Sequence, residues 1–106
     1  MNKDIVTINE VINDGSSIFF YQEEMSGVWA AYGYSAYLLS QMSGIRILSS
    51  FSELMQMPCV CITNSDFRGI VKDNMAIIEC RDGYFYLPTS SKVDESEYRH
   101  WTNSLK

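Results

Sequence analysis

The side chains best suited to chemistry in this sequence are three cysteines and one histidine. Cys59 and Cys61 are separated by one residue, and in an extended strand this spacing puts both thiols on the same side. A structural zinc ion needs more ligands than this pair offers, and His100 is the only histidine that could join the cysteines. We therefore expect no metal site. We expect the cysteines, Cys80 included, to be reduced and packed as small apolar side chains.

No arrangement of residues indicates catalysis. His100 carries the only imidazole, the side chain most often used as a general base near neutral pH, and it lies in a predicted terminal helix. The acidic pairs Glu23–Glu24 and Glu95–Glu97 fall in a turn and at a helix N-terminus, where solvation and the helix dipole favour carboxylates. The glycines match neither common phosphate-binding motif. We predict a non-catalytic protein without a cofactor; the alternative is a small enzyme that uses His100 or a cysteine.

Aromatic side chains offer a second kind of chemistry, because they can stack on bases or anchor a protein partner. The segment VWAAYGYSA, residues 28–36, places Trp29 on one side of a predicted strand and Tyr32 on the other. Trp29 stands at the start of the strand, next to a turn, and a ring exposed there would be available to a partner. Packing in the core is the favoured reading of this side chain, since small proteins fill their cores with large aromatic side chains.

Cationic side chains could add contacts to phosphate groups. Arg68 and Lys72 are four residues apart and would form a small cationic stripe on one helix. Asp66 and Asp73 flank this stripe, so a solvated helix face is the alternative. The residues that we predict to contact nucleic acid or a partner are Trp29, Tyr32, Arg46, Arg68 and Lys72.

Length and charge narrow the classes of protein to consider. With 106 residues, 46% of them hydrophobic, the chain fits a single globular domain over residues 1–106. Thirteen acidic residues against eight basic ones give a net charge of −5, which disfavours tight autonomous binding to DNA. The apolar runs are much shorter than a membrane span, and the N-terminal residues lack the apolar stretch of a signal peptide. We expect a cytoplasmic protein without membrane contact.

Local patterns predict the elements that position these residues. The first helix is amphipathic, with an apolar stripe of Ile5, Ile8, Val11 and Ile12. The predicted elements are, in order, a helix over 5–13, strands over 17–22 and 27–32, a helix over 35–44 capped by Ser35, a strand over 45–48, one or two helical turns over 51–56, a strand over 58–63, a helix over 66–74 capped by Asn64 or Ser65, a hairpin over 75–88 turning at Asp82–Gly83, and a helix over 93–105 capped by Asp94. Strands interleaved with helices favour an α/β or α+β class, with helices packed on a mixed sheet.

From Ile18 to Glu79, the order of these signals resembles the N-terminal, mismatch-sensing domain of the MutS family of DNA mismatch repair proteins. That domain runs from an apolar strand through a G-D-F-Y-E-x-F-G-x-D-A segment to a helix ending near L-G-I-x-L-T, then through I-P-M-x-G-V-P, a helix and a V-A-I-C-E strand. Here SIFFYQ looks like the first strand, VWAAYGYSA like the F-Y-E-x-F-G-x-D-A segment, LLSQMSGIRIL like the helix and the next strand, and MQMPCVCITNSDFRGIVKDNMAIIEC like the remainder. The resemblance spans residues 18–80 and implies a fold like that of MutS domain I.

The resemblance also implies contact with DNA or with a DNA-repair complex. Two substitutions affect how a mismatched base could be recognised. Val28 stands where the family has the phenylalanine that wedges beside a mismatched base, and Ala30 stands where it has the partner glutamate. Valine cannot stack on a base, and alanine forms no side-chain hydrogen bond. We expect a non-catalytic MutS domain I-like module that contacts DNA weakly, or a DNA-bound protein complex, without wedge recognition. The alternative is a protein-interaction or regulatory module, homodimeric in form, that has lost nucleic-acid binding.

Overall fold

The structure, a computed structural model, describes residues 3–23, 27–80, 83–90 and 92–106. Within these residues it contains six β-strands and four α-helices. In chain order the elements are α1 (Lys3–Ile12), β1 (Ser17–Glu23), β2 (Val28–Tyr32), α2 (Gly33–Ser40), β3 (Leu48–Ser52), β4 (Met57–Thr63), α3 (Asn64–Asp73), β5 (Ile78–Glu79), β6 (Tyr84–Pro88) and α4 (Glu95–Ser104). This composition confirms the predicted α+β class.

The strands form one sheet in the order β3-β4-β2-β1-β6-β5. We predicted a mixed sheet, but all the described neighbouring pairs are antiparallel. The reason lies in the position of β4. Helix α2 carries the chain from β2 to β3, which run in the same direction, and β4 then inserts between these two strands and runs opposite to both.

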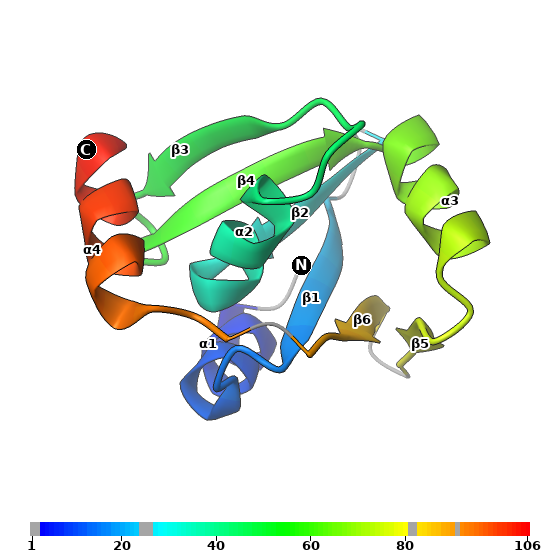
Figure 1. Ribbon diagram of the computed structural model, residues 1–106, viewed down its shortest axis with the longest axis horizontal. Helices are drawn as coiled ribbons and strands as arrows, with labels where there is room; N and C mark the ends of the chain where they lie inside the picture. Colours follow the sequence, from blue (N-terminus) through cyan, green and yellow to red (C-terminus); the bar gives the residue numbers. More distant parts are fainter. Residues whose placement is uncertain (1–2, 24–26, 81–82, 91) are drawn as a thin grey trace.

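Alternation along the strands divides the side chains between two cores, one on each face of the sheet. Helices α2 and α3 cover the larger core, and α1 packs against the smaller one. Figure 1 shows α2 lying across the middle of the sheet, with α3 and α4 at opposite ends of it. The larger core contains Ile18, Phe20, Trp29, Ala31, Val60, Ile62 and Leu87 from the sheet, with Ala36, Leu38, Leu39, Phe67 and Ile70 from the helices. The smaller core contains Val6, Tyr21, Ala30, Tyr32, Met55 and Cys59.

Helix α2 begins two residues earlier than predicted, and Ser35 is not its cap. The N-cap residue is Tyr32, and the helix starts at Gly33, whose φ is +60°. A Cβ atom at Gly33 would lie 3.0 Å from Glu10 Oε1. Only glycine therefore suits this sharp change from strand to helix. Ser35 lies inside the first turn, where its side chain is fully buried.

The N-cap of α4 is the predicted residue, whereas the N-cap of α3 is not. The Asp94 side chain accepts a hydrogen bond from Glu97 N–H at 3.0 Å, which confirms the predicted cap of α4. The cap of α3 is Thr63, not Asn64 or Ser65, and its Oγ1 accepts from Asp66 N–H at 3.1 Å. The hydroxyl of Thr63, one residue before Asn64, therefore caps the helix in place of the predicted side chains.

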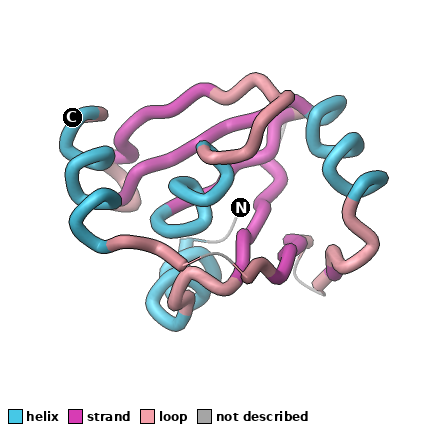
Figure 2. Tube along the Cα trace, in the orientation of Figure 1, coloured by secondary structure: helices cyan, strands magenta, loops and turns pink. Residues whose placement is uncertain are grey.

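Two predicted strand segments differ in their extent. The strand predicted over 45–48 is a loop up to residue 47, and β3 begins only at Leu48. The predicted hairpin is confirmed by the antiparallel pair β5–β6, in which Ile78 faces Tyr86. Its turn residue Asp82 lies outside the described residues. Figure 2 shows the C-terminal end of α4 beside β3, where Lys106 Nζ lies 4.9 Å from the centroid of the Phe51 ring.

Candidate functional site

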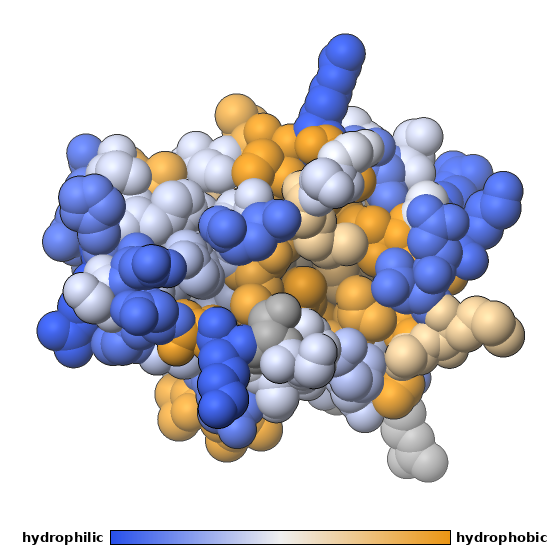
Figure 3. Space-filling model, in the orientation of Figure 1, coloured by the Kyte–Doolittle hydropathy of each residue, from blue (hydrophilic) through white to orange (hydrophobic). Residues whose placement is uncertain are grey.

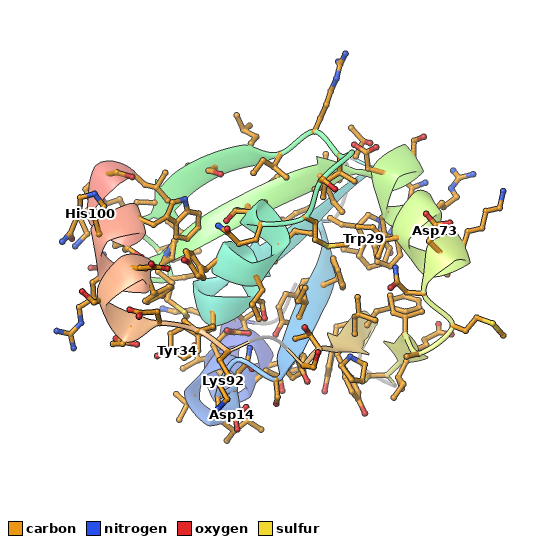
Figure 4. The ribbon with its side chains drawn as sticks, viewed as in Figure 1. Asp14, Trp29, Tyr34, Asp73, Lys92 and His100 are labelled. Atoms are coloured by element: carbon orange, nitrogen blue, oxygen red, sulfur yellow. The ribbon has the colours of Figure 1, made fainter. Side chains whose placement is uncertain are left out.

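Trp29 is a core side chain, which agrees with the favoured core packing and corrects its place among the residues predicted to contact a partner. It is 6% exposed and stacks on Phe67, with the two ring centroids 3.8 Å apart and the rings 15° from parallel. The Phe85 ring meets it edge-on at 5.4 Å, and the indole N–H donates to Asn64 Oδ1 at 3.0 Å. Figure 4 shows Trp29 between the sheet and α3. The indole is buried and Phe67 already occupies one of its faces, so the ring cannot stack on a base.

Tyr32 is buried as well, on the opposite face of the sheet. It is 5% exposed, and its hydroxyl donates to Glu23 Oε1 at 3.1 Å. Burial raises the pKa of this phenol above its ordinary value, and the nearby Cys59 and Glu23 raise it further. Trp29 and Tyr32 therefore do not form one aromatic surface, and the predicted contact through Tyr32 is corrected in the same way.

The three predicted cations are exposed and lie around α3. Arg68 and Lys72 project from this helix, and Arg46 belongs to the loop before β3. The Arg46 backbone N–H donates to Asp66 Oδ2 at 3.3 Å, which holds that loop against the first turn of α3. Asp73, on the same helix, is also exposed (Figure 4). The predicted site thus separates into two buried aromatic side chains and a group of exposed cations.

The residues considered for catalysis are dispersed. His100 is exposed on the outer side of α4 (Figure 4), whereas Cys59 and Cys61 lie in β4. The Glu95 carboxylate accepts a hydrogen bond from the guanidinium of Arg99, one turn along α4, at 3.3 Å. It also accepts a hydrogen bond from the hydroxyl of Tyr34, which connects α4 to α2. Glu95 thus has a structural role, and among the described residues His100 and the two cysteines lie in different elements, α4 and β4.

Sequence reasoning missed a buried polar network between α1 and α2. Glu10 Oε2 accepts a hydrogen bond from Ser35 Oγ at 2.7 Å, and Oε1 accepts from Ser35 N–H and from Asn13 Nδ2, both at 3.3 Å. Asn13 Nδ2 also donates to the carbonyl oxygen of Ser17 at 2.9 Å, and Phe19 N–H donates to Ser35 Oγ at 2.9 Å. The network joins α1, β1 and α2 through polar side chains.

The carboxyl group of Glu10 titrates near neutral pH because of this position. Burial raises its pKa from 4.5 to about 7, and the hydrogen bonds from Ser35 and Asn13 oppose only part of that rise. Ser35 is completely buried, so a substrate cannot reach its hydroxyl. We read this network as a structural attachment of α1 whose strength depends on pH.

The outer face of α1 carries an apolar ridge, formed by Ile8, Val11 and Ile12. These side chains are 61%, 79% and 71% exposed. The inner face of the same helix is formed by Val6 and by the polar Asn9, whose amide donates to the hydroxyl of Tyr21 at 3.1 Å. Figure 3 shows apolar atoms at the lower edge of the molecule, where Figure 1 places α1. Most of the predicted apolar stripe therefore faces outward, whereas the apolar stripe of an amphipathic helix usually faces the core.

A shallow groove of about 590 Å³ lies between α2, the end of β6 and the segment that leads to α4. Its floor is apolar and includes Ile18, Leu38 and Leu87, and Lys92 and Glu97 place opposite charges at its rim. Figure 3 shows the apolar hollow near the centre of the molecule. No cysteine or histidine belongs to the described residues that line it.

All three cysteines are free, and the thiols of Cys59 and Cys61 lie 3.9 Å apart. In the part of the chain that the structure describes, no group of three or more His, Cys, Asp or Glu side chains is arranged to hold a metal ion. None of the described helices is both long and apolar enough to cross a membrane.

Comparisons with known proteins found no relative of this chain. No protein-family model, no curated protein and no solved structure matches this chain. Function must therefore be argued from the surfaces and groups described above.

Proposed function

We propose that this chain is a non-catalytic protein-interaction module that pairs with a second copy of itself through the α1 ridge. The observation that carries the proposal is the outward orientation of Ile8, Val11 and Ile12 on a helix that points polar side chains inward. Burying an aliphatic side chain of this size stabilises a protein by about 1.5–3 kcal/mol. A ridge of three such residues left in water is typical of a surface that a partner covers.

The geometry of the ridge suits a second copy of the same helix. Residues at spacings of three and four lie along one side of a helix and can interdigitate with the same residues of an antiparallel partner. The last turn of α1 carries no basic residue, and Asp14 follows the helix. In an antiparallel pair, Lys3 of each copy would approach this negative end of the partner helix. Asp4 in the first turn offsets this attraction, so packing of the ridge, and not charge, carries the pairing.

Replacing Val11 by lysine is expected to weaken self-association at least about tenfold, because a charge would have to be buried at the centre of the ridge. Sedimentation equilibrium of the wild-type chain and of Val11→Lys measures this effect. The side chain is exposed in the single chain, so the helical circular dichroism should not change. Leu54→Lys is the matched control, since Leu54 is 68% exposed in the turn between β3 and β4. A wild-type chain that stays monomeric at millimolar concentration would contradict the proposal, as would equal weakening by the control.

Contact with nucleic acid is the second candidate function. The hydrogen bond from Arg46 N–H to Asp66 favours it, because it brings Arg46 beside the helix that carries Arg68 and Lys72. The resemblance to MutS domain I supports the same candidate. With Trp29 buried, such contact would depend on charge alone, would be weak, and would fall steeply with salt.

The double replacement Arg68→Glu/Lys72→Glu is expected to weaken DNA binding at low salt about tenfold or more and to flatten its dependence on salt. Fluorescence anisotropy of labelled duplex, mismatched and single-stranded DNA provides the measurement. Lys92→Glu is the control, because Lys92 is exposed at the rim of the groove and not on α3. Binding that is absent for the wild-type chain at low salt, or that is unchanged in the double variant, would exclude this candidate.

A further inference from the structure

Strand β4 holds two thiols side by side on the face of the sheet that α1 covers in part. The sulfur atoms of Cys59 and Cys61 are 3.9 Å apart. Cys59 is buried, and Cys61 is half-buried. Both residues belong to a ladder that is hydrogen-bonded on two sides, with β2 on one side and β3 on the other. The backbone that carries the two sulfurs is therefore held by a neighbouring strand on each side.

Solvent can reach this pair from the β3 side. The cross-strand neighbour of Cys61 in β3 is Leu48, which is 71% exposed, and the neighbour of Cys59 is Ser50, which is also exposed. These side chains lie beside the thiols on the same face, and the exposure of both leaves that edge of the site open.

We propose that Cys59 and Cys61 form a two-thiolate site for a thiophilic d10 metal ion, Zn²⁺ or Cu⁺, whose other coordination positions are open to solvent ligands. Two sulfurs bonded at the ordinary zinc–sulfur length to a tetrahedral ion lie about 3.8 Å apart. The observed separation of 3.9 Å matches this value without movement of the strand. The proposal changes our expectation of no metal site, which considered only a closed structural set of ligands.

A disulfide suits the same pair less well. The sulfur–sulfur bond is about 2.05 Å long, roughly half of the observed separation. Forming that bond would require β4 to bend between Cys59 and Cys61, and pairing with both neighbouring strands resists this bend. Thiolates in a fixed, open arrangement are instead the ligands that soft metal ions prefer.

Anaerobic titration of the fully reduced chain with Cd²⁺ at pH 8 tests the site, because cadmium–thiolate bonds have an ultraviolet charge-transfer band. We expect the band to saturate at one ion per chain and to be lost in Cys59→Ser and in Cys61→Ser. Cys80→Ser is the matched control and should keep it. Parallel titrations with Zn²⁺ and with Cu⁺, each against a competing chelator, show which ion binds more tightly.

Three results would overturn the site: a band that persists in the Cys59→Ser/Cys61→Ser double variant, a band that disappears in Cys80→Ser, or saturation at one ion per two chains. Circular dichroism of each variant shows whether it is folded. If Cys59→Ser does not fold because Cys59 is buried, Cys61→Ser decides the question, since the half-buried Cys61 tolerates a small polar side chain.

Discussion

Replacing Trp29 by alanine is expected to lower the free energy of unfolding by about 3–5 kcal/mol, the usual cost of removing a large aromatic side chain from a core. The change removes the stack on Phe67, the edge contact with Phe85 and the hydrogen bond to Asn64. A tryptophan on an exposed binding surface would cost much less, within roughly 0.5 kcal/mol. Urea unfolding of the wild-type chain and of Trp29→Ala therefore separates the two roles.

Two further variants make this measurement specific. Trp29→Phe keeps an aromatic ring against Phe67 but removes the indole N–H, so it should lose clearly less stability than Trp29→Ala. Trp101→Ala removes the other tryptophan, which is half-buried on α4 and meets Tyr37 edge-on at 5.4 Å. Its loss should also be smaller. A Trp29→Ala variant as stable as the wild-type chain would show that the ring does not belong to the core in solution.

Replacing Glu10 by glutamine is expected to stabilise the chain by about 2–3 kcal/mol above pH 7.5 and to have little effect near pH 4.5. The pKa of Glu10 is about 7 in the folded chain and 4.5 when the side chain is exposed. Between these values the folded state holds a proton that the unfolded state has lost, so the free energy of unfolding falls as pH rises. A pKa difference of this size corresponds to about 3 kcal/mol. Glutamine resembles the protonated acid and removes this loss.

The measurement is the difference in unfolding free energy between wild type and Glu10→Gln, taken from urea unfolding at several pH values from 4.5 to 8.5. Other titrating groups affect both chains equally and cancel in the difference. Asp14→Asn serves as the control, because hydrogen bonds from Ser16 lower the pKa of the exposed Asp14 from 3.8. Its carboxyl group is therefore ionised in both the folded and the unfolded chain over this range, and the effect of Asp14→Asn on stability should not vary with pH. A difference that does not vary with pH would show that Glu10 is ionised in the folded state throughout this range.

Several elements were predictable because their signals are local. Asp94 caps α4 through a backbone N–H three residues away, and runs of β-favouring apolar residues predicted β1, β2 and β4 with nearly their observed bounds. The start of α2 was predicted wrongly because the contact that decides it is not local. Ser35 looks like a cap in its own segment, but Glu10, 25 residues away, takes the hydroxyl into a buried network.

For the candidate sites too, local features were predictable from the sequence and burial was not. Sequence alone could place Trp29 and Tyr32 on opposite sides of one strand, and Cys59 and Cys61 on the same side of another, because side chains alternate with a period of two. It could not show that both faces of the sheet are covered at β2. That depends on Phe67, which reaches Trp29 from a helix far along the chain, and on the core beneath α1.

The sequence by itself determined the α+β class, most of the strands and helices, and the shared face of the two cysteines. The tertiary structure decided which surfaces remain for binding: it buried the aromatic side chains predicted to contact a partner, left the cations around α3 exposed, and turned the apolar residues of α1 outward. The physical reason is the range of the interactions. Periodicity and capping act over a few residues, whereas burial is set by packing between segments that are distant in the chain.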